Sequence, residues 1–271
     1  MLRRKFTVAL ASIGLLAGLT ACGSSDASSD KDGPLKVAVN PVPHGDILKY
    51  VKDELAGKAG LKLEIVTFDD YVQPNRALKE HQVTANYFQH VPFMREFESA
   101  QKTKLTFVAP VHLEPLGVYS RKVKDLKSVA NGATVALSND PANQGRGLKL
   151  LADNGVITLK PGASTSATEK DIATNPKNLK FKPLKPAQLP RSLDEVDLAV
   201  INGNYALEAD LAPNKDALAA EKPDGNPYAN GLVTLPGDKD DPRVKKLADL
   251  LRGPEVKKFI QDKYKGSVIS A

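Results

Sequence analysis

ATVALSNDPANQGRGLKLLADN, residues 133–154, is the stretch that decides the fold class. Its first five residues are apolar and partly β-branched, which is typical of a short buried strand. Ser138, Asn139 and Asp140 offer helix-capping side chains, and Pro141 stands where the first helical turn needs no N–H donor. Asn154 and the glycine after it are a stop signal. The pattern therefore predicts a strand, a tight turn and a helix.

Two polar residues on this predicted helix indicate a binding site. Asn143 and Arg146 are three residues apart on its early turns, so they share a face. In open α/β sheets, ligands bind at the carboxyl ends of strands, where this helix begins. A guanidinium beside a helix N-terminus suits a carboxylate, and Gly145 and Gly147 flank the arginine and leave room for another group to approach the backbone. A solvated arginine on a surface helix is the alternative interpretation.

The N-terminus is typical of an exported lipoprotein. Arg3, Arg4 and Lys5 precede an apolar run that is too short and too interrupted for a membrane span. The letters LTAC at 19–22 resemble a bacterial lipobox. We expect a signal peptide over 1–21, cleavage before Cys22 and a lipid on its sulfur. Cys22 is the only cysteine, so no internal disulfide can form. An ordinary signal peptide with an incidental cysteine is the alternative.

The segment after the lipobox is small and polar, which predicts a flexible tether over 22–34. Removal of the signal peptide takes three positive charges and no negative ones, so the formal net charge falls from +6 to +3. Acidic and basic residues are interspersed at this low charge, which gives no indication of nucleic-acid binding. The remaining length of about 250 residues is near the size at which one core divides into two.

The rest of the chain alternates strand and helix patterns, which predicts an α/β protein. Residues 35–40 and 61–66 read as strands on either side of a helix, and 197–201 reads as a further buried strand. We expect two lobes, each a mixed sheet flanked by helices. The predicted first lobe is 35–118 with 233–271, and the second is 119–232. Since the chain leaves the first lobe and returns to it, two crossing strands would form a hinge.

No catalytic motif is present in the sequence. It lacks G-x-S-x-G and the glycine-rich loops that hold phosphates, and its one cysteine is assigned to the anchor. The polar residues at predicted strand ends are aromatic groups, amides and one arginine, which suits holding a small zwitterion rather than transforming it. The candidate ligand-binding residues are Tyr71, Phe88, His90, Asn143, Arg146, Asn202 and Asn230. Singly, the aromatic residues could be core residues, and Asn202 and Asn230 could be turn residues.

A metal site is the second hypothesis. The four histidines are His44, His81, His90 and His112, and Glu114 follows the last of them closely. No pair has the i, i+4 spacing of a strong zinc motif, although His44 and His90 both follow predicted strands at the same edge. A zinc-type site of His44, His90, His112 and Glu114 therefore stays open. For His112, a hydrogen-bonded structural role is the simpler interpretation.

Nine segments between residue 35 and the C-terminus carry a family resemblance. They are VNPVPH (39–44), DYVQPN (70–75), ANYFQHVP (85–92), SNDP (138–141), GR (145–146), NPKNL (175–179), QLPRSL (188–193), AVINGNY (199–205) and PYAN (227–230). Together they resemble the NlpA/MetQ-type lipoproteins, the methionine-binding components of ABC importers. One departure is Gln144, where many relatives have glutamate or leucine.

The resemblance implies a periplasmic-binding-protein-like fold and a carrier rather than an enzyme. The protein would be a monomer anchored through acyl chains such as palmitate to the extracytoplasmic face of the cell membrane. It would bind methionine, D-methionine or a methionine dipeptide in the interlobe cleft, and deliver it to an ABC permease with its ATPase subunits. No cofactor is expected.

The resemblance also implies roles for the candidate residues. Arg146 would bind the ligand α-carboxylate, with Asn143 alongside. Asn202 and Asn230 would serve the α-ammonium and carboxylate groups. The side-chain pocket would be walled by Tyr71, Phe88 and His90. In an open, empty state we expect the Arg146 charge to be exposed, so that its loss would spare the fold.

Overall fold

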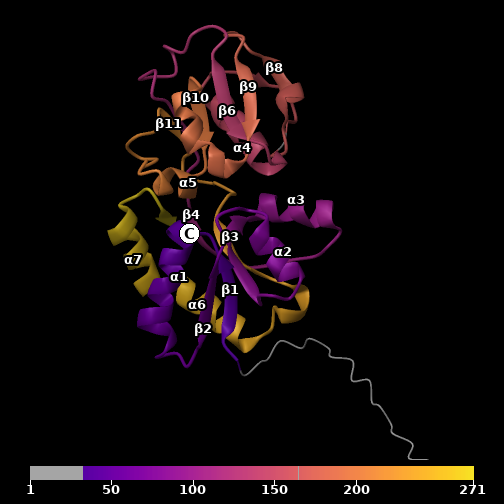
Figure 1. Ribbon diagram of the computed structural model, residues 1–271, viewed down its shortest axis with the longest axis vertical. Coiled ribbons are helices and arrows are strands. Elements are labelled where there is room, and N and C mark those ends of the chain that lie inside the picture. The colour runs from indigo at the N-terminus through magenta and orange to yellow at the C-terminus, as the bar shows by residue number, and fades with distance from the viewer. Residues whose placement is uncertain (1–32, 164) are drawn as a thin grey trace, which may run out of the picture.

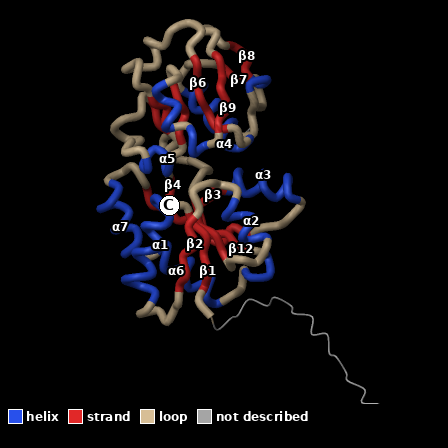
Figure 2. The backbone as a smooth tube through the Cα atoms, in the orientation of Figure 1, coloured by secondary structure: helices blue, strands red, loops and turns tan. Residues whose placement is uncertain are grey.

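The computed structural model describes residues 33–163 and 165–271. The predicted signal peptide, Cys22 and most of the tether lie outside these residues. Within the described part of the chain, no helix has the length and apolar content needed to cross a membrane. Figures 1 and 2 show two α/β lobes, one above the other, with α3, α4 and α5 near their junction.

The first lobe contains a six-stranded mixed sheet of order β13-β4-β12-β3-β1-β2. Its strands are β1 (Leu35–Val39), β2 (Leu63–Thr67), β3 (Ala85–His90), β4 (Thr106–Leu113), β12 (Asn230–Thr234) and β13 (Ile269–Ser270). β1 pairs in parallel with β2 and β3, whereas β12 is antiparallel to β3 and β4. The helical segments are η1 (Pro41–Gly45), α1 (Asp46–Tyr50), η2 (Val51–Ala56), α2 (Gln73–Lys79), α3 (Val91–Gln101), η6 (Pro236–Asp238), α6 (Pro242–Arg252) and α7 (Pro254–Tyr264).

Helices cover both faces of this sheet. Because successive residues of a strand point to opposite faces, the residues of β1 contribute alternately to two apolar cores. Val37 and Val39 belong to the core cluster that includes Leu247 of α6 and the apolar residues of α1 and α7. Ala38, between them, belongs to the cluster that includes Leu78 of α2. A strand covered on both sides must be apolar throughout, which explains why β1 reads as a continuous apolar run.

The second lobe contains a five-stranded sheet of order β11-β5-β10-β6-β9 and a small ribbon, β7-β8. Its strands are β5 (Gly117–Tyr119), β6 (Thr134–Ser138), β7 (Thr158–Leu159), β8 (Ile172–Thr174), β9 (Lys180–Leu184), β10 (Leu198–Ile201) and β11 (Ala219–Ala220). Its helical segments are α4 (Pro141–Asp153), η3 (Glu169–Asp171), η4 (Pro186–Gln188), η5 (Pro190–Asp194) and α5 (Gly203–Glu208).

The predicted strand–turn–helix unit is confirmed as β6 and α4. Asp140 is the N-cap of α4, and its carboxylate accepts a hydrogen bond from the backbone N–H of Asn143 at 2.9 Å. Another part of the chain approaches the backbone at Gly145, as the sequence predicted. A Cβ there would lie 2.3 Å from the backbone oxygen of Thr165, so this glycine makes room for a loop of the protein rather than for a ligand.

The chain crosses between the lobes twice. It leaves the first sheet after Leu113 and enters the second at Gly117, and it returns between Ala220 and Asn230. Strand pairing thus puts Gly117 in the second sheet and Asn230 in the first, each a few residues from the predicted lobe boundary. The differences arise because Pro115 divides the long extended run, and because Asn230 extends β12 beside both β3 and β4. The predicted division of the chain into two lobes otherwise stays a prediction.

Candidate functional site

The two lobes meet at a small pocket. Its lining residues are Tyr71, Phe88, Gln89, His90, Phe93, Glu114, Asn143, Arg146, Asn202, Gly203, Asn204 and Asn230. All seven residues that the sequence suggested for ligand binding are in this set. The structure therefore brings them together in one place.

The sheet topology explains the convergence. Phe88 and His90 lie at the carboxyl end of β3, and Asn202 follows β10 as the N-cap of α5. Asn230 begins its strand, but β12 is antiparallel to β3, so Asn230 pairs with His90. Asn143 lies on the first turn of α4, directly after β6. Each side chain reaches the junction from a different element, as expected where strands of two sheets end against one another.

Hydrogen bonds join the lobes across the pocket. His90 of the first lobe contacts Asn143 of the second, with 3.2 Å between Nε2 and Oδ1. The Tyr71 hydroxyl donates to Oδ1 of Asn204 at 2.5 Å, and the Tyr205 hydroxyl donates to the backbone oxygen of Asp69 at 2.9 Å. The lobes are therefore in direct contact, in a closed arrangement.

Aromatic rings form one side of the pocket. The ring centroids of Tyr71 and Phe88 are 6.1 Å apart, and Phe93 lies within 6 Å of both. Such a wall binds an apolar or thioether side chain. Phe93 was not among the candidate ligand-binding residues. Its position three residues after His90, on the first turn of α3, is the signal that places it at the pocket.

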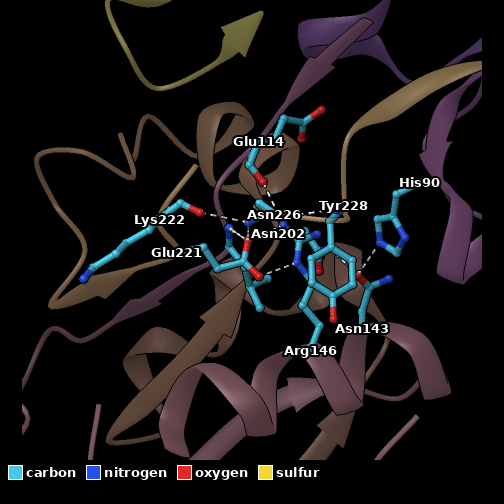
Figure 3. Close-up of polar contacts among 10 residues, drawn as sticks. His90, Glu114, Asn143, Arg146, Asn202, Glu221, Lys222, Asn226 and Tyr228 are labelled. Carbon is cyan, nitrogen blue, oxygen red and sulfur yellow. Dashed lines mark hydrogen bonds and ion pairs between the residues drawn. The ribbon is translucent and has the colours of Figure 1, made fainter. Parts of the chain in front are cut away.

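Arg146 is buried and ion-paired in this closed arrangement, whereas the exposed charge was expected for the open, empty state. Its side chain is 3% exposed. Nε donates to Oε1 of Glu221 at 2.8 Å and Nη2 donates to Oε2 at 2.5 Å, while Nη2 also donates to the backbone oxygen of Glu114 at 2.9 Å (Figure 3). The guanidinium carbon lies 4.3 Å from the centre of the Tyr228 ring. Burial alone would lower the pKa of Arg146, but Glu221 raises it.

One donor group of Arg146 is left for a ligand. Among residues 33–163 and 165–271, Nη1 has no hydrogen-bond partner. The Glu221 carboxylate is held in turn by the backbone N–H of Leu116 at 3.0 Å and by Asn226 at 3.3 Å. Burial would raise the pKa of Glu221, but its contacts with Arg146 hold it below the usual value. Glu221 is therefore the buried counter-ion of Arg146.

Glu221 and Tyr228 were not among the predicted site residues. Glu221 opens the segment EKPDGNP, 221–227, whose composition is that of a solvated turn. Nothing local distinguishes its carboxylate from a surface acid. Tyr228 gave a signal only as part of the PYAN segment, beside Asn230.

His90 is neutral, and its tautomer follows from its partners. Nδ1 accepts from the backbone N–H of Phe93 at 3.2 Å, so Nε2 carries the proton and donates to Asn143. Burial, followed by the Arg146 charge, lowers the pKa of His90 to about 3. His90 thus acts as a polar wall of fixed orientation rather than as a charge.

The side chain of Asn143 is fully engaged with protein groups. Oδ1 accepts from His90 and, at 2.9 Å, from Asn202, while Nδ2 donates to the Asp140 carboxylate at 3.0 Å. In this arrangement Asn143 has no free donor for a ligand carboxylate. Its contacts instead fix the side chains of His90 and Asn202, one from each lobe.

Three of the four residues in the metal hypothesis lie together. Possible ligand atoms of His44, His112 and Glu114 are within 4.8 Å of one another, and all three residues are buried. His90 is not part of this cluster. Oε1 of Glu114 lies 2.7 Å from Nε2 of His112 and 3.1 Å from Nε2 of His44, whereas ligands of one tetrahedral zinc are about 3.3 Å apart. Hydrogen bonds to Glu114 and Tyr87 account for His112, in agreement with its suggested structural role, whereas neither ring nitrogen of His44 has a hydrogen-bond partner among the described residues.

Comparison with known proteins identifies the family. The family model described as NlpA lipoprotein matches residues 35–271. The chain belongs to the NlpA lipoprotein family. The methionine-binding lipoprotein MetQ of Bacillus subtilis is 40% identical, over 93% of each chain. The D-methionine-binding lipoprotein MetQ of Escherichia coli is 37% identical, over 98% of this chain and 97% of that protein.

A solved structure has the same fold. The nutrient-binding protein of Burkholderia cenocepacia, whose structure is described as bound to methionine, is 44% identical with a TM-score of 0.85. The match covers 88% of this chain and 99% of that one. The α/β fold with two mixed sheets flanked by helices is therefore confirmed for this NlpA lipoprotein.

The buried ion pair gives a stability prediction. Glu221→Gln leaves the Arg146 charge buried without its counter-ion, so the free energy of unfolding should fall by on the order of 3 kcal/mol. Glu195→Gln is the matched control, because Glu195 forms an exposed ion pair with Lys182. This substitution should lower the free energy of unfolding by less than about 0.5 kcal/mol. Urea unfolding measures both variants. Equal losses in the two would contradict the assignment of Glu221.

The low pKa of His90 gives a pH prediction. His90 stays neutral in the folded state down to about pH 3 but takes up a proton near pH 6.5 when unfolded. Its stabilising contribution is therefore complete above about pH 6.5 and is lost as the pH falls below that value. Between about pH 7 and 5 the free energy of unfolding should fall by about 2 kcal/mol more in the wild type than in His90→Gln.

Urea unfolding at several pH values measures this difference. His81→Asn is the control, because His81 is exposed and should keep the pH dependence of the wild type. Parallel curves for His90→Gln and the wild type would show that His90 does not stay neutral in the folded protein.

Proposed function

We propose that this protein is the lipid-anchored, extracytoplasmic substrate-binding component of an ABC importer, and that it binds methionine in the interlobe pocket. The observation that carries this proposal is the pocket itself, with an aromatic wall from one lobe and an ion-paired arginine from the other. The named functions of the MetQ relatives and the methionine in the Burkholderia cenocepacia structure support the choice of ligand.

The two sides of the pocket suit the two ends of methionine. A carboxylate that leaves water is costly unless it is paired, and Nη1 of Arg146 offers a charged donor for it. A thioether against aromatic rings gains about 0.3–1.5 kcal/mol per contact, and Tyr71, Phe88 and Phe93 supply such rings. Because one ligand would touch both lobes, it would stabilise their closed arrangement, which a permease could recognise.

The residues that line the pocket suit a carrier protein better than an enzyme. Among the described residues, no serine, threonine, cysteine or lysine lines the pocket, so the commonest nucleophiles of covalent catalysis are missing there. The site residues Tyr71, Phe88, His90, Arg146, Asn202 and Asn230 are proposed to contact ligand, and Asn143 to orient two of them. The lipid on Cys22, the permease with its ATPase subunits, and a monomeric state are part of the same proposal.

Calorimetry tests the proposal on protein that has been refolded from denaturant and treated with chelator. L-Methionine should bind with micromolar or tighter affinity, and Zn²⁺ alone should give no saturable heat. Arg146→Lys keeps a charge beside Glu221 but loses the guanidinium fork, so the affinity should fall roughly 10- to 100-fold. Arg191→Lys is the control, because Arg191 is exposed and outside the pocket.

Two results would refute the proposed function. One is heat with Zn²⁺ and none with methionine, which would favour the metal-binding alternative. The other is the same methionine affinity in Arg146→Lys and Arg191→Lys, which would remove Arg146 from the site.

A further inference from the structure

The described chain begins at the end of the first lobe that lies opposite the pocket. β3 runs toward the pocket and ends there at His90, and β1 runs parallel to both β3 and β2. The amino ends of these three strands therefore lie at the other end of the lobe. Figure 1 shows that β1 starts at the end of the molecule that is farthest from the second lobe. The residues before Leu35 must join the folded protein at this end.

Strand pairing gathers five segments at this end. The N–H of Leu35 donates to the carbonyl of Lys62 at 2.8 Å, which joins the loop before β2 to the start of β1. The N–H of Thr84 joins the loop before β3 to β1 in the same way, at 3.0 Å. Thr234, the last residue of β12, pairs with Thr106, the first residue of β4, so the loops beyond both residues also lie here. We define the far end of the first lobe as residues 33–36, 57–64, 79–84, 102–105 and 235–246.

Positive charge is concentrated at the far end. Its five segments contain ten lysines and arginines but only five aspartates and glutamates, so their formal net charge is +5. Residues 33–271 as a whole also have a net charge of +5, so the remainder of these residues is neutral overall. The segments are far apart in the sequence, and the concentration of charge exists only in the folded chain.

The acids of the far end do not neutralise most of its lysines. Three of the acids are taken by ion pairs with Lys36, Lys245 and Arg243. Six exposed lysines form no ion pair and no side-chain hydrogen bond within the part of the chain that the structure describes. They are Lys58, Lys62, Lys102, Lys104, Lys239 and Lys246. Their ammonium groups are therefore available to anions outside the chain.

Some of these cations surround the start of the described chain. Nη1 of Arg243 donates to the carbonyl of Gly33 at 3.0 Å, which brings the first turn of α6 to the entry point. Nζ of Lys246 lies 4.0 Å from the position that a Cβ would take at Gly60, so α6 and the loop before β2 share one surface. Lys62 lies on the same loop, beside Leu35. The basic surface therefore borders the point from which the tether would leave.

A lipid on Cys22 would hold this surface close to the membrane. Gly33 is eleven residues after Cys22, and a chain of that length spans at most about 40 Å when fully extended. The intervening residues contain three aspartates and one lysine, so they supply no net positive charge. Anionic lipids attract basic groups that come within about a Debye length, which is about 8 Å at physiological ionic strength. A lipid anchor and a basic surface at one end of a protein reinforce each other in membrane binding.

We propose that the far end of the first lobe is a membrane-docking surface, whose unpaired lysines contact anionic phospholipid headgroups beside the lipid anchor. This inference goes beyond the proposed function and takes from it only the lipid on Cys22. The pocket lies at the opposite end of the first lobe. Docking would therefore orient the protein with its pocket and second lobe away from the headgroups.

Vesicle flotation tests the surface separately from the anchor. The protein is the mature chain, residues 22–271, with Cys22→Ser so that no lipid is attached. It should bind vesicles of phosphatidylcholine and phosphatidylglycerol at low salt, and high salt or phosphatidylcholine alone should abolish the binding. The triple variant Lys58→Gln, Lys62→Gln, Lys246→Gln should bind the anionic vesicles roughly 100-fold more weakly.

A second triple variant is the matched control. Lys124→Gln, Lys127→Gln, Lys185→Gln changes the net charge by the same amount at exposed positions of the second lobe. Its affinity for the anionic vesicles should stay within about twofold of that of the unsubstituted chain, because these lysines lie beyond the Debye length from the docked surface. None of the six substituted lysines lines the pocket, so both variants should retain the methionine affinity of the unsubstituted chain if they fold correctly.

Three results would overturn the inference: equal binding to both kinds of vesicle, equal losses in the two triple variants, or no binding of the unsubstituted chain. Binding to the permease that depends on Lys58, Lys62 and Lys246, without binding to vesicles, would assign the surface to a protein partner and would also overturn it. Failure to bind methionine would refute the proposed function, but the vesicle result would still decide the docking surface. The two failures are therefore distinguishable.

Discussion

The ion pair between Arg146 and Glu221 is the contact on which the interlobe site depends. A guanidinium buried to this degree would be strongly destabilising without a counter-charge. Glu221 supplies that charge from the segment between β11 and β12, which returns the chain to the first lobe. It also forms hydrogen bonds with the other crossing segment, between β4 and β5. Its carboxylate accepts from the N–H of Leu116, and its own N–H donates to the Leu116 carbonyl, each at 3.0 Å. The pair thus fixes the arginine of α4 to both segments that connect the lobes.

This arrangement prepares the pocket before any ligand arrives. Arg146, His90 and Asn143 each have defined partners, so their orientations are set by the protein and little ordering is left for the binding step. The aromatic wall belongs to the first lobe and the arginine to the second, while Glu114 lies between them in a crossing segment. A ligand that contacts the aromatic wall and the arginine would therefore touch both lobes, which couples binding to closure.

The parts of the fold and site that could be predicted are those with local signals. The β6–α4 unit has an apolar run, a capping aspartate and a stop signal within 22 residues, and the candidate ligand residues follow strand ends that topology brings to one edge. The partners of these residues were not predictable. Glu221 lies in a turn-rich segment, and its role exists only once the crossings are in place. The sequence likewise did not show what approaches the backbone at Gly145, because the loop that fills this space is distant in sequence.

The most direct measurement of the central claim is a crystal structure of the protein with bound L-methionine. The account predicts one molecule between the lobes, with its carboxylate about 3 Å from a nitrogen of Arg146 while Glu221 still holds the other side of the guanidinium. Its thioether should lie against Tyr71, Phe88 and Phe93. Methionine bound elsewhere, or bound in this pocket with its carboxylate away from Arg146, would contradict the account.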